Sequence, residues 1–161
     1  MNLAGYGLYF TGSGGNVDVT ECCLKKCECT GMVVSKGATA AAIRCEIMYS
    51  SGAGIVCSDA NTKATLIDST IHHNRVGLIV NVEATVTIEA TVTIRGINTD
   101  IHWNKCYGIL AFGGTVNIDL PQQHNTTHHN DEDRHQERGG SITNVIVPEY
   151  LPGTCSQCQE Y

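Results

Sequence analysis

The sequence lacks several features that would place it in a common functional class. It has no run of 18 apolar residues, so we expect no membrane-spanning segment. Its net charge is −6, with 16 acidic against 10 basic residues and no stripe of cations. Because a phosphate backbone is bound by clustered lysine and arginine, nucleic acid is excluded as the expected partner. No secretory leader is visible, which favours a cytoplasmic location.

Helical periodicity is also missing, and a longer period takes its place. A glycine followed by three mostly apolar residues occurs five times, and the glycines that begin these blocks are Gly7, Gly31, Gly54, Gly77 and Gly108. The steps between them are 24, 23, 23 and 31 residues. Self-similarity at a period of this size indicates a solenoid.

A second block lies between the glycine blocks and reads A-x-φ-x-x-C/S-x-φ-x-x-N, where φ is apolar. Cys22, Cys45 and Ser69 occupy its central position. Apolar residues two positions apart predict strands with one buried face, and the small polar residues predict bends. Each period therefore holds about three short strands and no helix. The predicted fold is all-β, a short parallel β-helix of about five coils.

The two blocks and their spacing, over roughly residues 5–130, resemble the right-handed parallel β-helix repeats of the pectin-lyase-like superfamily. The right-handed sense follows from that resemblance and from the general preference of parallel crossovers. We expect the β-helix domain to cover residues 1–147, with a polar loop at 121–140 and an irregular tail at 148–161. The resemblance implies an alternative function, a polysaccharide lyase or epimerase or a fragment of one.

Such enzymes need paired carboxylates, or aspartates that bind calcium beside a basic residue. The sequence places no column of acids on adjacent coils, and it contains no catalytic motif of the superfamily. We therefore predict no catalytic residue. If the chain were an enzyme, its site would lie in the long loops around Asp100, Trp103 and Asp131.

Alternation within the glycine blocks predicts which residues face outward. Polar residues follow each block at the parity of its second apolar residue, so that parity faces solvent. The outward column is nonetheless apolar and consists of Tyr9, Val33, Val56, Ile79 and Leu110. Because monomers rarely expose a large contiguous apolar patch, we expect a partner there. A second copy of the chain is the first expectation, and the chain's own tail is the alternative.

Histidines recur two residues before the asparagine that ends each block. His72, His102 and His128 would stack on neighbouring coils, and they are the candidate metal ligands. Stacked side chains lie about 4.8 Å apart, whereas ligand nitrogens around zinc lie roughly 3.4 Å apart. Two rings can converge on an ion and three in a line cannot. The alternative is a solvated turn beside a buried ladder formed by Asn74 and Asn104, each in a left-handed backbone conformation.

The nine cysteines form no convincing zinc motif. A dense group at residues 22–29 and a single C-x-x-C at Cys155 and Cys158 lie at opposite ends of the predicted stack. We expect Cys22, Cys45 and Cys57 to be buried, reduced core thiols. No cofactor is predicted. The function expected from the sequence is a non-catalytic structural or binding module that presents a flat β-helix face to a protein or a glycan, with Trp103 and Asp100 as further contact residues.

Overall fold

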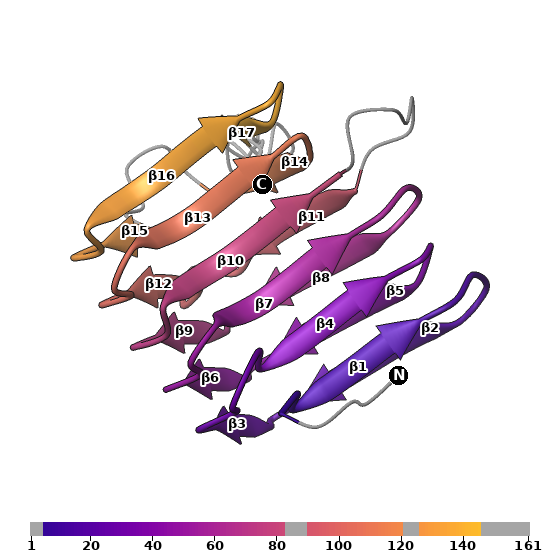
Figure 1. Ribbon diagram of the computed structural model, residues 1–161, viewed down its shortest axis with the longest axis horizontal. Coiled ribbons are helices and arrows are strands. Elements are labelled where there is room, and N and C mark those ends of the chain that lie inside the picture. The colour runs from indigo at the N-terminus through magenta and orange to yellow at the C-terminus, as the bar shows by residue number, and fades with distance from the viewer. Residues whose placement is uncertain (1–4, 83–89, 121–125, 146–161) are drawn as a thin grey trace, which may run out of the picture.

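The computed structural model describes residues 5–82, 90–120 and 126–145 (Figure 1). Its regular elements in these ranges are strands in three parallel sheets, which stack as a β-solenoid of about five coils. The all-β solenoid predicted from the repeat is confirmed. No helix in the described ranges has the length and hydropathy to cross a membrane.

Among the described residues, five coils contribute one strand to each sheet and a last coil contributes strands to sheets A and B only, and every strand pairs with its counterpart one coil away. Sheet A consists of β1 (Leu8–Thr11), β4 (Met32–Ser35), β7 (Ala53–Ser58), β10 (Val76–Asn81), β13 (Tyr107–Phe112) and β16 (Glu132–Glu137). Sheet B consists of β2 (Asn16–Thr20), β5 (Thr39–Ile43), β8 (Lys63–Ile67), β11 (Thr91–Arg95), β14 (Thr115–Ile118) and β17 (Ser141–Asn144). Sheet C consists of β3 (Cys23–Lys25), β6 (Glu46–Met48), β9 (Thr70–His72), β12 (Asp100–His102) and β15 (Thr127–His128).

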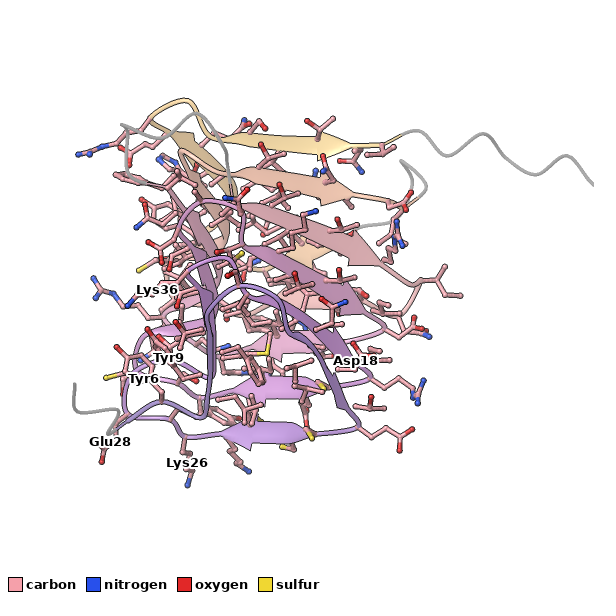
Figure 2. The ribbon with its side chains drawn as sticks, turned by 90° about the vertical axis from the view of Figure 1, so that its right-hand side faces the viewer. Tyr6, Tyr9, Asp18, Lys26, Glu28 and Lys36 are labelled. Carbon is pink, nitrogen blue, oxygen red and sulfur yellow. The ribbon has the colours of Figure 1, made fainter. Side chains whose placement is uncertain are left out.

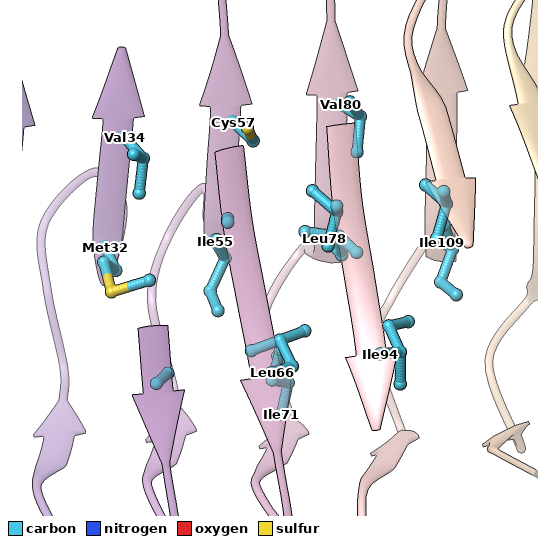
Figure 3. Packing of buried hydrophobic residues seen from close by; sticks show 14 of the residues in the cluster. Met32, Val34, Ile55, Cys57, Leu66, Ile71, Leu78, Val80, Ile94 and Ile109 are labelled. Carbon is cyan, nitrogen blue, oxygen red and sulfur yellow. The ribbon is translucent and has the colours of Figure 1, made fainter. Parts of the chain in front are cut away.

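The core is built from inward columns that run along the stack (Figure 3). In sheet A, side chains of like shape lie over one another in each column. The fully buried members of these two columns are Met32, Ile55, Leu78 and Ile109, and Val34, Cys57, Val80 and Ala111. The predicted inward parity is thus confirmed. Leu8 and Phe10, the first-coil members, are half-buried and pack against this core. Figure 2 shows this coil, where the rings of Tyr6 and Tyr9 lie 5.6 Å apart.

The repeat glycines are required by the close approach of neighbouring coils, and none of them has a left-handed backbone. A Cβ on Gly54 would lie 2.5 Å from Ile71 Cγ2 and 2.8 Å from the carbonyl oxygen of Gly77. Gly77 meets the same obstacles in Ile101 and Gly108. A side chain at this position would therefore collide with the next coil and with the interior of sheet C.

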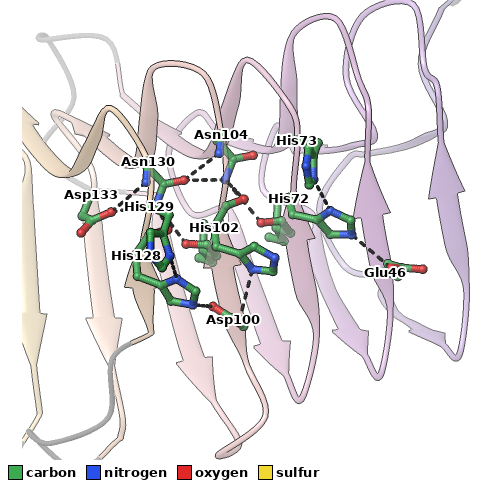
Figure 4. Close-up of polar contacts among 12 residues, drawn as sticks. Glu46, His72, His73, Asp100, His102, Asn104, His128, His129, Asn130 and Asp133 are labelled. Carbon is green, nitrogen blue, oxygen red and sulfur yellow. Dashed lines mark hydrogen bonds and ion pairs between the residues drawn. The ribbon is translucent and has the colours of Figure 1, made fainter.

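The bend between sheets C and A contains a ladder of buried asparagine amides (Figure 4). Asn74 Nδ2 donates to Asn104 Oδ1 at 3.3 Å, and Asn104 Nδ2 donates to Asn130 Oδ1 at 2.9 Å. The same oxygens accept the backbone N–H groups of the preceding coil, as Asn74 Oδ1 does from Ser50 at 2.9 Å. The predicted ladder is confirmed and extends to Asn130. Its amides satisfy backbone groups that the bend leaves without a strand partner.

The left-handed residue of this bend is the one before the asparagine, not the asparagine itself. Five residues at this place have φ between 53° and 57°, namely Lys26, Tyr49, His73, Trp103 and His129. A left-handed conformation costs a non-glycine residue roughly 1–2 kcal/mol. The amide ladder offsets this cost in the coils that contain it.

The prediction of a polar loop at 121–140 is wrong for much of the part that the structure describes. Residues 127–128 and 132–137 form β15 and β16. The sequence did not predict β16, because its inward positions are polar and give no apolar alternation. These positions are Arg134 and Gln136, opposite Ile109 and Ala111. Arg134 donates to Thr127 Oγ1 and Asn144 Oδ1, and Gln136 Oε1 accepts from the Ile142 N–H. These polar groups cover the core end of the described stack.

Two further expectations have different outcomes. Cys45 and Cys57 are buried as predicted, but Cys22 is exposed, because it belongs to the first coil and only one described coil packs against it. None of the described cysteines is in a disulfide bond. The tail at residues 148–161, with its C-x-x-C, lies outside the described residues.

We predict that Gly54→Ala lowers the free energy of unfolding by about 1–3 kcal/mol, as overpacking of a filled interior does. Urea denaturation followed by circular dichroism measures the change. Gly15→Ala is the matched control, because Gly15 has no left-handed φ and no atom within 4 Å of the added Cβ. Equal effects of the two substitutions would contradict the close-approach argument.

We also predict that Asn74→Leu destabilises the protein by at least about 2 kcal/mol, because it leaves the buried Ser50 N–H and other ladder groups without partners. The control is Asn16→Leu, at an exposed position of β2, which we expect to change little. The same urea titrations compare the two. Similar midpoints for Asn74→Leu and the unsubstituted chain would show that the ladder does not stabilise the bend.

Candidate binding surfaces

The structure distributes the predicted binding residues over three outer surfaces. The apolar column lies on sheet A, Trp103 lies at the bend between sheets C and A, and Asp100 lies on the outer face of sheet C. Sequence reasoning grouped Trp103 and Asp100 in one loop region. They lie on different surfaces, because the left-handed backbone at Trp103 turns its side chain outward at the bend between sheets C and A, whereas Asp100 stays on the face of sheet C.

The apolar stripe on sheet A is continuous and in register. Tyr9 pairs with Val33, Val33 with Val56, Val56 with Ile79 and Ile79 with Leu110. Val33 is only 7% exposed and its neighbours in the stripe are half-buried. Association of two copies through this stripe stays a prediction, which sedimentation velocity in solution tests.

The bend carries more exposed aromatic side chains than the stripe does. Tyr49 is 47% exposed and Trp103 is 54% exposed. Their rings contact histidines of the same column: Trp103 stacks on His129 at 4.8 Å with 4° between planes, and Tyr49 lies 5.1 Å from His73 with its ring tilted by 36°. The backbone aligns these rings, because a left-handed residue in each of the five coils points its side chain outward at the same bend.

A groove of about 640 Å³ follows this bend, and we call it the bend groove. Its lining residues are Tyr49, Ser50, Ser51, His73, Arg75, Trp103, Lys105 and Cys106. Arg75 and Lys105 are exposed and occupy equivalent places in adjacent coils, directly after Asn74 and Asn104. The lining thus combines aromatic rings with two cations and contains no carboxylate.

Ser50 lines the bend groove at the ladder position of its coil, the place that Asn74 and Asn104 occupy in the next two coils. Its hydroxyl is buried and has no hydrogen-bond partner among the described residues. A Cβ on Gly31 would lie 3.5 Å from this oxygen, as one on Gly54 would lie 3.0 Å from Nδ2 of Asn74, so the hydroxyl points into the bend and not into the groove. Sequence reasoning identified only Trp103 in this groove. The other lining residues could have been found from the repeat, since they precede or follow the ladder position in neighbouring coils.

The outer face of sheet C holds the three stacked histidines (Figure 4). The rings of His72 and His102 lie 5.2 Å apart and those of His102 and His128 lie 5.1 Å apart, with planes within 3° of parallel. The stack is straight, as the strand spacing predicts. His72 is occupied elsewhere, since its Nε2 lies 3.1 Å from Glu46 and its Nδ1 lies 2.6 Å from His73 Nδ1.

The group that could hold one metal ion therefore contains Asp100 in place of His72. One ligand atom from each of Asp100, His102 and His128 lies within 4.8 Å of the others. Asp100 Oδ1 lies 2.9 Å from His128 Nε2, and Asp100 Oδ2 lies 3.2 Å from His102 Nδ1. Burial lowers the pKa of His102, and the charge of Asp100 opposes this effect.

Comparisons with known proteins leave the family of this chain open. No protein-family model matches the chain, and no solved structure matches it. The chain is 28% identical over 142 residues to SHC SH2 domain-binding protein 1 of Mus musculus. This similarity covers 88% of the chain but only 21% of the length of that relative.

The buried thiol of Cys57 gives a test of how the core excludes reagents. Burial, and then the charge of Asp59, raise the pKa of Cys57 to about 12. At pH 8 only about one thiol in ten thousand would then be thiolate, the reactive form. We predict that iodoacetamide at pH 8 modifies the exposed Cys23 and Cys29 in the folded protein but not Cys57, and that all three react after unfolding. Peptide mass spectrometry measures this, and equal labelling of Cys57 and Cys29 in the folded state would contradict it.

Proposed function

We propose that the chain is a non-catalytic binding module that takes a protein partner in the bend groove. The observation that carries the proposal is the lining of that groove, in which exposed Tyr49 and Trp103 stand beside Arg75 and Lys105. Tryptophan, tyrosine and arginine are the residues that contribute most to the binding energy of protein interfaces. A groove that gathers them on a rigid solenoid suits recognition.

The charge of the groove indicates the chemistry of the partner. Arg75 and Lys105 lie on adjacent coils of a chain whose net charge is −6, so this cationic site stands out from its surroundings. Carboxylates on a partner segment would pair with these cations while an apolar side chain packs on Trp103. We therefore propose an acidic, partly apolar protein segment as the occupant.

The relative supports a protein partner over a glycan. Its name describes it as a protein that binds the SH2 domain of SHC, and the similarity lies in a segment that makes up 21% of its length. The SHC SH2 domain is therefore the first partner to test with this chain.

The rival function is that of a pectin-lyase-like enzyme acting on an acidic polysaccharide. It rests on the resemblance of the repeats to that superfamily, which implies the fold more strongly than the activity. Hydrolysis and elimination at a sugar need carboxylates or a metal beside the substrate. The lining of the bend groove contains no carboxylate, which supports binding over turnover.

The single tryptophan of the chain makes the experiment direct. The protein is labelled with 5-fluorotryptophan, so that the ¹⁹F signal reports on Trp103 alone, and is titrated with unlabelled SHC SH2 domain. We expect a saturable shift of this signal, with an affinity that agrees with calorimetry. Trp103→Ala, and Arg75→Glu combined with Lys105→Glu, should each weaken the binding at least about tenfold, the effect of losing one hot-spot residue.

The matched controls place the same changes outside the groove. Lys63→Glu reverses an exposed cation on sheet B, and Ile97→Ala removes an exposed apolar side chain. Both should bind like the unsubstituted chain. Polygalacturonate is added as a separate ligand. Saturation by the polysaccharide without response to the SH2 domain would favour the glycan, release of unsaturated sugars would favour the enzyme, and no response to either would contradict the proposal.

A further inference from the structure

The outer face of sheet C carries a second arrangement that the bend groove does not use. Asp100 and His102 lie two residues apart on β12, so both side chains point to the same face, and His128 on β15 pairs with His102 one coil away. These three side chains form a triangle across two adjacent coils (Figure 4). We propose that Asp100, His102 and His128 bind a zinc ion.

The donor atoms have separations close to those of a zinc site. Zinc binds nitrogen and oxygen at about 2.0–2.2 Å in a tetrahedral arrangement, which places ligand atoms roughly 3.4 Å apart. The two contacts from Asp100 to the histidine nitrogens measure 2.9 Å and 3.2 Å. All three ligand atoms lie within 4.8 Å of one another. The remaining adjustment is a rotation of the two parallel rings toward each other, which side-chain torsions allow.

The buried atoms of this triangle are not paired by hydrogen bonds. Asp100 Oδ1 and His102 Nδ1 are shielded from solvent and have no hydrogen-bond partner among the described residues. Their short contacts are those within the triangle, from Asp100 Oδ1 to His128 Nε2 and from His102 Nδ1 to Asp100 Oδ2, both at ion-pair distance. Buried polar atoms in native proteins are normally satisfied. An ion between the three side chains would satisfy both of these atoms at once.

The orientation of His128 is held from outside the triangle. Its Nδ1 lies 2.6 Å from Nδ1 of His129, while its Nε2 faces Asp100. A contact on the far ring nitrogen is the usual way in which a protein orients a histidine ligand. The chemistry of the donors selects the class of ion, since two imidazoles and one carboxylate suit zinc and its neighbours, and calcium or magnesium would require oxygen ligands.

The same chain offers an internal comparison. Glu46 on β6 contacts His72 on the next coil at 3.1 Å, as Asp100 contacts His128. The residue that corresponds to His102 in that earlier pair is Met48, which lies opposite His72 in the sheet. The earlier pair therefore lacks the second imidazole. The zinc site requires His102, and the repeat supplies it at one place in the described stack.

The test is a zinc titration of the metal-free protein in which exposed thiols have first been capped with iodoacetamide, so that cysteine does not compete. Long-range ¹H–¹⁵N spectra follow the ring nitrogens of each histidine. We expect one zinc ion per chain, with shifts at Nδ1 of His102 and Nε2 of His128 and no shift at His72. Asp100→Asn and His128→Gln should each raise the zinc Kd at least about 100-fold, beyond the loss seen for outer-shell partners.

His72→Gln is the matched control, because His72 belongs to the same stack but not to the triangle, and its Kd should stay within about threefold of the starting value. Circular dichroism checks that each variant is folded. Three outcomes would overturn the proposal: no binding up to about 1 mM zinc, binding that Asp100→Asn leaves unchanged, or binding without a shift of the His102 and His128 nitrogens. Equal losses in His72→Gln and His128→Gln would also overturn it.

Discussion

The close approach of neighbouring coils at the bend between sheets C and A is the constraint on which the rest of the structure depends. The glycine column and the asparagine ladder meet there, since a Cβ on Gly54 would lie 3.0 Å from Nδ2 of Asn74 and one on Gly77 would lie 2.9 Å from Nδ2 of Asn104. The amides fit because the glycines have no side chain. In return, the amides bond to backbone groups that the tight bend removes from the sheets.

This internal constraint sets the outer surface but does not fix its chemistry. The bend places a left-handed residue in each of five coils, also before Cys27 and Ser50 where no asparagine follows, and the side chain of that residue points away from the core. His73, Trp103 and His129 can therefore differ from coil to coil without a change in packing. Variation on the outside of a repeated bend therefore changes the lining of the bend groove without a change in the interior, at the cost of backbone strain in a few residues.

The sequence predicts the architecture well because the constraint repeats. The glycine period, the inward columns and the Asn74–Asn104 ladder could all be derived from spacing, since parallel in-register stacking converts sequence period into spatial contact. Prediction failed where a coil departs from the period. Strand β16 has Arg134 and Gln136 at its inward positions, and their polar atoms are satisfied by partners that no hydropathy pattern reveals.

The candidate sites were predictable only in part for a different reason. Spacing aligns residues along a column, so it found the stack of His72, His102 and His128, but it is silent on contacts between columns. Asp100 contacts His128 diagonally, on the neighbouring strand and two positions further along it. Such a contact depends on the direction in which each side chain leans.

The bend groove is lined by the residue before and the residue after each ladder position. The repeat aligns each of these positions with its own copies in other coils, but it does not show that the two positions line one groove. His102 and Trp103 show the physical basis of this separation. They are adjacent in the chain, yet one belongs to a sheet face and the other to the corner, because the backbone turns left-handed between them. In a solenoid of this kind, the local backbone conformation decides which surface a side chain serves, and the repeat decides only which neighbours it has there.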